Sequence, residues 1–155
     1  MEEYKVALEK ANKSLKIADH MLSVTYKLVN DPKLLLSIIE HIFAAMLSGM
    51  DAVLLFERLY KRVPPYSKTF DGKVNMFREK CIERIGLDNS FIALLFDLRS
   101  IIKEHKESPI EFCRKDKLVI CSNTYRMKVL SVNEIKKYLS KAKLFIDAIN
   151  SFVKK

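Results

Sequence analysis

The sequence contains few of the residues that break helices. Its 155 residues include three glycines, four prolines and no tryptophan. Because glycine and proline punctuate strands and turns most often, their scarcity favours a few long helices over many short strands. A chain of this length with 49% hydrophobic residues can bury a proper core. We therefore expect residues 1–155 to form a single domain.

Cysteines are also few, and they show no metal-binding pattern. Cys81, Cys113 and Cys121 include no Cys-x-x-Cys pair and have no histidines at metal-ligand spacing, so we expect no metal and no cofactor. Cys113 and Cys121 are spaced so that they would be able to meet across a hairpin, but we favour two ordinary apolar cysteines. The acidic, amphipathic start, MEEYKVALEK, is unlike a signal peptide. We expect a reduced, cytoplasmic protein that does not enter a membrane.

Positive charge is abundant. The chain has 28 Lys and Arg against 19 Asp and Glu, a formal net charge of +9. A balance this basic suggests a polyanionic partner, and nucleic acid is the commonest. The alternative is that the lysines only solubilise helix faces, because they are spread along the chain and not gathered in one block.

Residues 31–62 form the most apolar stretch and predict a central helix. Asp31 suits the N-cap, and Pro32 suits the first helical position because it lacks an N–H. Charged residues such as Glu40 and Glu57 interrupt the stretch too often for a membrane span. Two adjoining sets of apolar or small residues recur at helical spacing, which predicts burial on several sides: Ile38, Ile42, Ala45, Gly49, Ala52, Phe56 and Leu59, then Leu35, Ile39, Met46, Val53 and Leu54.

Small residues cluster on this central helix, at Ala44, Ala45, Ser48, Gly49 and Ala52. Small side chains let another backbone approach closely. The neighbour is either another helix of the same chain or a partner subunit, and we favour the helix of the same chain.

The remaining elements are helical, apart from one interruption. The short turn after residues 2–30 predicts an antiparallel hairpin with the central helix. Within 2–30 a stripe at 4-3 spacing predicts the buried face: Tyr4, Leu8, Ala11, Leu15, Ala18, Leu22, Thr25 and Val29. Further helices are expected over residues 71–85, with Gly86 as the left-handed C′ residue, and from a cap at Asp88 or Asn89 to about Lys106. A capping box, Ser131 to Glu134, starts the last helix.

Residues 110–130 interrupt the helices with a different pattern, which is clearest from 118 to 129. A β-branched run, a turn at 122–124 and an alternating segment predict a short β-hairpin that packs on the bundle. The predicted fold is therefore all-α. It is an antiparallel up-and-down bundle of about five helices, with a short β-hairpin inserted before the last helix.

Candidate chemistry is concentrated in one segment, LRSIIKEH at residues 98–105. The chain shows no Gly-rich phosphate loop, no nucleophile elbow and no carboxylate–histidine cluster with metal spacing. The segment carries Arg99 and His105, with five residues between them, near the end of a predicted helix.

The order of elements and this Arg–His motif resemble the HEPN superfamily. The resemblance covers most of the chain, from the long helical hairpin through the segment 99–105 to the final helix. It implies a metal-independent endoribonuclease, often a toxin with a cognate antitoxin or nucleotidyltransferase partner. It also implies a homodimer in which two Arg–His pairs face one another. Other relatives are inactive modules that bind RNA or a nucleotide.

The resemblance assigns roles that suit the chemistry of these side chains. Arg99 would hold phosphate oxygens with its planar fork of donors, and His105 would act as base or acid because it titrates near neutrality. Ser100 and Glu104 would position the pair. RNA would be steered to the site by neighbouring lysines, Lys103 and Lys106.

Helix geometry sets a condition on this site. Six residues along an ideal helix leave Arg99 and His105 about 120° apart. They converge only if the helix loosens near Lys103 or if one of them acts across a dimer interface. In the alternative reading, Arg99 pairs with Glu57 or with Asp97 of a neighbouring chain.

In that reading His105 merely ends the helix, where its positive charge would be stabilised by the helix dipole. The chain would then be a non-catalytic module that binds a partner protein or a nucleotide. The sequence leaves open whether the chain is an enzyme.

Overall fold

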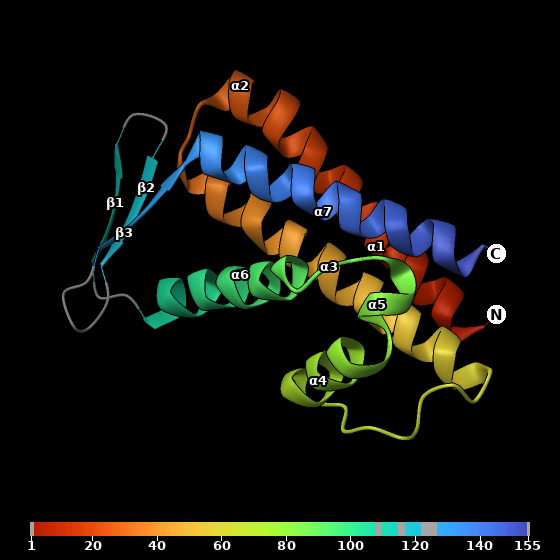
Figure 1. Cartoon of the computed structure of the whole chain (residues 1–155). Helices are drawn as coiled ribbons and strands as arrows, with labels where there is room; N and C mark the ends of the chain where they lie inside the picture. The colour runs from red at the N-terminus through yellow and green to blue at the C-terminus, as the bar shows by residue number, and fades with distance from the viewer. Residues whose placement is uncertain (1, 108–109, 115–116, 122–126, 155) are drawn as a thin grey trace.

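The computed structural model describes residues 2–107, 110–114, 117–121 and 127–154. Figure 1 shows long helices running along α3, with a small sheet at one end of the molecule and both chain termini at the other. The predicted helical bundle with a β-hairpin before the last helix is confirmed. The elements in chain order are α1 Glu3–His20, the π-helical turn η1 Met21–Thr25, α2 Tyr26–Val29, α3 Lys33–Leu59, α4 Phe70–Lys80, α5 Ile82–Ile85, α6 Ser90–Glu107, β1 Ile110–Arg114, β2 Lys117–Cys121, β3 Met127–Ser131 and α7 Val132–Val153.

Helix α3 is the central helix, as predicted. Both predicted apolar sets are buried except for Leu59, which is 54% exposed. The Asp31 carboxylate accepts the N–H of Lys33 at 3.0 Å, so it caps the start of the helix. By length and composition α3 would also be able to cross a membrane. Helices α1, α6 and α7 pack around it, however, so α3 is the core helix of the bundle.

The first helical segment departs from its predicted stripe. The turn η1 is π-helical, and the wider turn shifts the phase of the residues that follow it. Leu22 is buried as expected, but the next buried residue is Tyr26 instead of Thr25. Val29, predicted to end the stripe, is 61% exposed.

The small residues of α3 allow the close approach of α7. A Cβ added at Gly49 would lie 2.7 Å from Cδ1 of Ile146 and 3.1 Å from Cδ1 of Ile149. The prediction that a helix of the same chain covers this position is confirmed for Gly49.

The predicted helix over residues 71–85 is divided at Cys81 into α4 and α5. Helix α5 ends at Gly86, whose φ of 86° places it in the left-handed region, as predicted. Asp88 then caps α6 by accepting the N–H of Ser90 at 2.9 Å. At the start of α7, the Ser131 hydroxyl accepts the N–H of Glu134 at 3.2 Å, which confirms that cap.

The sheet is larger than the predicted hairpin. Strands β2 and β3 are the expected antiparallel pair, and β1 adds a third strand, in the order β1-β2-β3. Register pairs Cys113 with Leu118 and Cys121 with Ile110, so the two cysteines are not opposite one another. The predicted turn at 122–124 lies outside the described residues.

Candidate functional site

Helix α6 stays regular through the whole Arg–His segment. It is α-helical from Ser90 to Glu107, so it does not loosen near Lys103. Arg99 and His105 therefore remain about 120° apart on the helix surface. Within one chain the two side chains lie on different faces of α6. Because the helix does not loosen, the two residues would combine in one site only across a dimer interface.

His105 lies at the margin of the core. It is half-buried, and it stands four residues after the buried Ile101 and seven after the buried Leu98. Residues at this spacing share one face of a helix. The imidazole therefore projects from the face of α6 that packs on the bundle.

Arg99 is on the solvent side and is held by an aromatic ring. Its guanidinium carbon lies 4.4 Å from the centroid of Phe70, a cation–π contact. Phe70 is itself fixed between Phe43 and Phe96, whose ring centroids lie 6.0 and 5.6 Å away. Contact with a fixed ring restricts the arginine while its N–H donors remain exposed.

The ion pair suggested for Arg99 with Glu57 is wrong. The Glu57 carboxylate instead pairs with Arg62 and with Arg84. In the part of the chain that the structure describes, no ion pair involves Arg99. Its charge is therefore available to a partner.

Three cations of α6 share one exposed face. Arg99, Lys103 and Lys106 follow one another at steps of four and three residues, and all three are exposed. We call these three residues the α6 basic stripe. Ser100 is exposed and Glu104 is half-buried, about 100° and 140° round the helix from Arg99. One chain thus brings the predicted cations together, but it does not bring Ser100, Glu104 or His105 beside Arg99.

A second charged cluster, which the sequence analysis did not single out, lies at the far end of α3. Glu57 is fully buried, and its Oε2 accepts hydrogen bonds from Nε of Arg62 and, at 2.9 Å, from Nη1 of Arg84. Its Oε1 is buried with no hydrogen-bond partner among the described residues, which costs about 1–3 kcal/mol. A signal was present, because Glu57 continues the buried set four residues after Val53. Arg84 comes from α5 and was not predictable by spacing.

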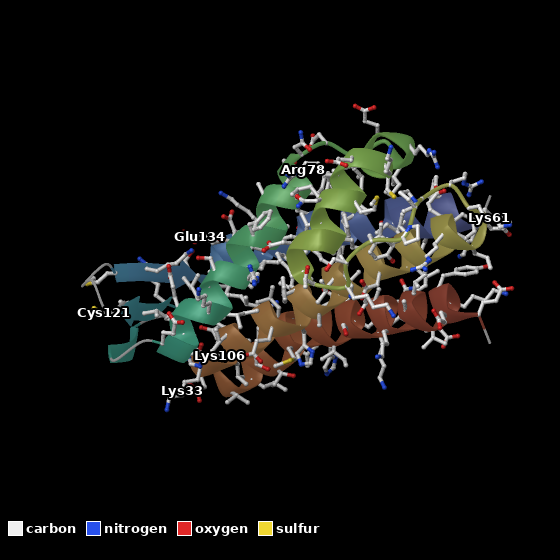
Figure 2. The ribbon with its side chains drawn as sticks, turned by 90° about the horizontal axis from the view of Figure 1, so that it is seen from below. Lys33, Lys61, Arg78, Lys106, Cys121 and Glu134 are labelled. Carbon is white, nitrogen blue, oxygen red and sulfur yellow. The ribbon has the colours of Figure 1, made fainter. Side chains whose placement is uncertain are left out.

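The cluster borders a pocket of about 520 Å³ whose lining includes Tyr4, Tyr60 and Phe152. Figure 2 shows the two ends of the molecule, with Lys61 labelled at one end and Lys106 and Cys121 labelled at the other. The pocket therefore lies far from the α6 basic stripe. None of the described pockets is lined by Arg99 or His105.

Cys81 lies close to this cluster but does not have the properties of a nucleophile. Burial, with a smaller contribution from the Glu57 charge, raises the pKa of its thiol to about 12. At neutral pH the sulfur is therefore protonated, and a protonated thiol is a poor nucleophile. Among the described residues, no group of three or more His, Cys, Asp or Glu side chains is arranged to hold a metal ion.

Comparison of the sequence with protein-family models and with curated proteins gives no match. The resemblance to the HEPN superfamily therefore stays a prediction, supported by the order of elements and the Arg99–His105 segment alone.

Proposed function

We propose that this protein is an RNA-binding, HEPN-like helical bundle that contacts the RNA backbone through the α6 basic stripe. Successive cations of the stripe are about 4.5–6 Å apart along the helix axis. Each offers donors to phosphate oxygens, and the net charge of +9 would draw a polyanion to the surface.

The observation that carries this proposal is the state of Arg99. Arg99 is an exposed residue that makes no ion pair within the described residues, and its guanidinium rests on Phe70. No carboxylate of the described segments neutralises its charge, which therefore remains available to a phosphate. A guanidinium held in place loses little conformational freedom when it binds phosphate.

We further propose that cleavage, where it occurs, takes place in a homodimer and needs no metal. Arg99 of one copy and His105 of the second copy would meet around one RNA strand. The histidine takes the proton of a 2′-hydroxyl, and the 2′-oxygen attacks the adjacent phosphorus. The arginine stabilises the charged phosphorane, and the 5′-oxygen leaves and takes up a proton. The products are a 2′,3′-cyclic phosphate and a 5′-hydroxyl.

A complementation experiment tests the shared site. Arg99→Ala and His105→Ala should each lower cleavage of single-stranded RNA by about 10²-fold or more, with chelator present. A mixture of the two variants, unfolded and refolded together, should recover about a quarter of the parent activity. Half of the dimers would then be mixed, and each mixed dimer would hold one intact site out of two.

The outcomes separate the alternatives. Cleavage that survives both substitutions would mean that the activity is a contaminant or lies elsewhere. Inactive variants that do not complement one another would contradict the shared site. If the parent cuts no RNA but binds it through the stripe, the protein is a binding module without catalysis.

The setting of this activity belongs to the same proposal. A ribonuclease of this kind would act in the cytoplasm, where RNA is abundant. It would also need restraint by a cognate antitoxin or nucleotidyltransferase. Purification of the protein with such a partner from its native source, and loss of toxicity when the two are co-expressed, would test this part.

A specific observation favours a second candidate, a protein-interaction module. Apolar side chains are exposed at the end of the first helical segment, where Leu28 is 80% exposed and Val29 is 61% exposed. On the sheet, Met127 of the edge strand β3 is 64% exposed. Charged substitutions at Leu28 and Val29 that abolish partner binding and leave RNA binding intact would support this candidate.

A further inference from the structure

The cluster of Glu57, Arg62 and Arg84 holds two guanidinium groups at one point of the surface. Both arginines donate to the same oxygen of Glu57, Oε2. Their side chains remain 43% and 44% exposed, whereas the carboxylate is fully buried. One buried negative charge therefore positions two positive charges, and the three groups together carry a net charge of +1.

The backbone at this place is arranged to bring Arg62 back onto α3. Lys61 has a φ of 57°, in the left-handed region that residues other than glycine seldom occupy. Around it, the Arg62 N–H bonds to the carbonyl of Glu57 at 2.9 Å, and the Lys61 N–H bonds to that of Arg58 at 3.0 Å. These two bonds make a Schellman motif, which turns the chain at the end of the helix.

Most of the donors of the two arginines remain available. A guanidinium has about five N–H donors, and each arginine uses one of them on Glu57. Within residues 2–107 and the other described segments, neither arginine makes a further hydrogen bond. Two guanidiniums with unused N–H donors at one place are suited to bind an oxyanion, since arginine N–H pairs match the spacing of phosphate oxygens.

Aromatic rings line the same pocket. Tyr60, Tyr4 and Phe152 border it, and Tyr60 is 56% exposed. The Arg62 guanidinium already stacks on the ring of Tyr60, with the guanidinium carbon 5.1 Å from the ring centroid. A volume of about 520 Å³ lies within the range of small-molecule sites.

We propose that this pocket binds a phosphate monoester that carries a planar ring. Arg62 and Arg84 hold the phosphate, Tyr60 and Phe152 flank the ring, and Glu57 keeps the two arginines in place. Nucleotides and phosphorylated aromatic compounds share this chemistry. The site is separate from the α6 basic stripe, so it does not depend on the function proposed for α6.

The alternative is that the cluster only ties α5 and the end of α3 together. A purely structural ion pair has no need of a pocket or of donors that face outward. It would also be expected to satisfy both carboxylate oxygens, whereas Oε1 of Glu57 has no partner in the described part of the chain.

Titration of the isotopically labelled protein, followed by NMR, tests the proposal. The probes are inorganic phosphate, phenyl phosphate, adenosine and AMP. We expect phenyl phosphate and AMP to shift resonances around Tyr60 and Arg84, each binding at least tenfold more tightly than inorganic phosphate or adenosine. AMP binding more tightly than phenyl phosphate would identify a nucleotide site, and the reverse order would identify a site for simpler phosphorylated rings.

Three variants and a matched control locate the binding. Arg84→Gln should weaken AMP binding at least tenfold, and Arg84→Lys should weaken it less because it keeps the charge. Tyr60→Ala leaves the ion pairs in place and should weaken AMP but not inorganic phosphate. Arg78→Gln, which removes an exposed arginine outside the pocket, should stay within twofold of the parent.

Several results would overturn the proposal. Absence of any shift with 10 mM AMP would do so, as would shifts outside the pocket or equal effects of Arg84→Gln and Arg78→Gln. If Arg84→Gln does not fold, Arg84→Lys and Tyr60→Ala still decide the question. Unaltered AMP binding in both would leave the cluster with a purely structural role.

Discussion

Lys61 is one of two non-glycine residues with a positive φ in the part of the chain that the structure describes, and the other, Asn30, belongs to a type that tolerates it. Its φ of 57° costs a residue with a Cβ about 1–2 kcal/mol, a cost that glycine does not carry. The equivalent position after α5 is occupied by a glycine, Gly86. The strained lysine directly precedes Arg62, whose N–H bonds back to the carbonyl of Glu57.

Replacement of Lys61 by glycine should therefore stabilise the protein. We expect Lys61→Gly to raise the free energy of unfolding in urea by about 0.5–1 kcal/mol, since part of the gain is lost to the greater freedom of glycine in the unfolded chain. Lys61→Ala keeps the Cβ and should bring no such gain. Equal effects of the two substitutions would show that the left-handed conformation is not the cause.

Gly49 lies where α7 approaches α3 closely. Gly49→Leu should lower the free energy of unfolding by about 3 kcal/mol, because the added side chain has to displace Ile146 and Ile149. Glu40→Leu, on an exposed position of the same helix, should change it by no more than about 0.5 kcal/mol. If both variants melt like the parent, α7 does not pack closely on Gly49.

At the scale of elements, the sheet is attached to the bundle through one face. Leu118 and Leu130 are fully buried, and β3 runs directly into α7. A sheet of three short strands needs a buried apolar face to be stable, and the contact with the bundle provides it.

A pair of neighbouring substitutions on β3 tests this attachment. Leu130→Ala should cost about 2–5 kcal/mol and increase hydrogen exchange throughout β2 and β3, because it leaves a cavity under the sheet. Val129→Ala, on the outward face and 40% exposed in the parent, should cost about 0.5 kcal/mol or less. Similar costs for the two would mean that the sheet is not anchored by its inner face.

Elements and caps were predictable where the information is local. The stripe of α3, the cap at Ser131 and the left-handed Gly86 depend on residues within a few positions of each other, and all were predicted. The π-helical turn was not predicted, because the apolar residues around it keep the regular 4-3 spacing of an α-helix. Strand β1 was missed since its segment has no strong alternation of its own.

The candidate sites divide in the same way. The α6 basic stripe follows from the spacing of Arg99, Lys103 and Lys106 on one helix. The pairing of Glu57 with Arg84 joins residues 27 positions apart on different helices, and no spacing rule connects them. The sequence also suggested Glu57 as a partner for Arg99. Only the packed structure shows that Arg84 of α5 and Arg62 of the turn after α3 pair with that carboxylate.

At the scale of the whole molecule, α3 separates two charged regions. It has 27 residues and is therefore roughly 40 Å long. The α6 basic stripe lies on the half of α6 that leads to the sheet. The pocket beside Glu57, Arg62 and Arg84 lies at the opposite end of the molecule, which carries both termini (Figure 1). The two proposed ligands, RNA and a phosphate monoester, would therefore bind without competing directly.

The salt dependence of RNA binding tests the central proposal most directly. Cations that meet phosphates release counterions, so the affinity of the parent for single-stranded RNA should fall steeply as salt rises. The triple variant Arg99→Gln, Lys103→Gln, Lys106→Gln should flatten the slope of log K against log salt by about 2, since each phosphate contact on a single strand contributes about 0.7.

The matched control removes three exposed lysines elsewhere, with Lys13→Gln, Lys16→Gln and Lys27→Gln. It makes the same change in net charge and should alter the slope far less than the variant of α6. The predicted result is therefore a large loss of slope that is specific to α6. Equal slopes for the two variants, or RNA binding by the parent that does not depend on salt, would contradict the assignment of the α6 basic stripe as the RNA-binding surface.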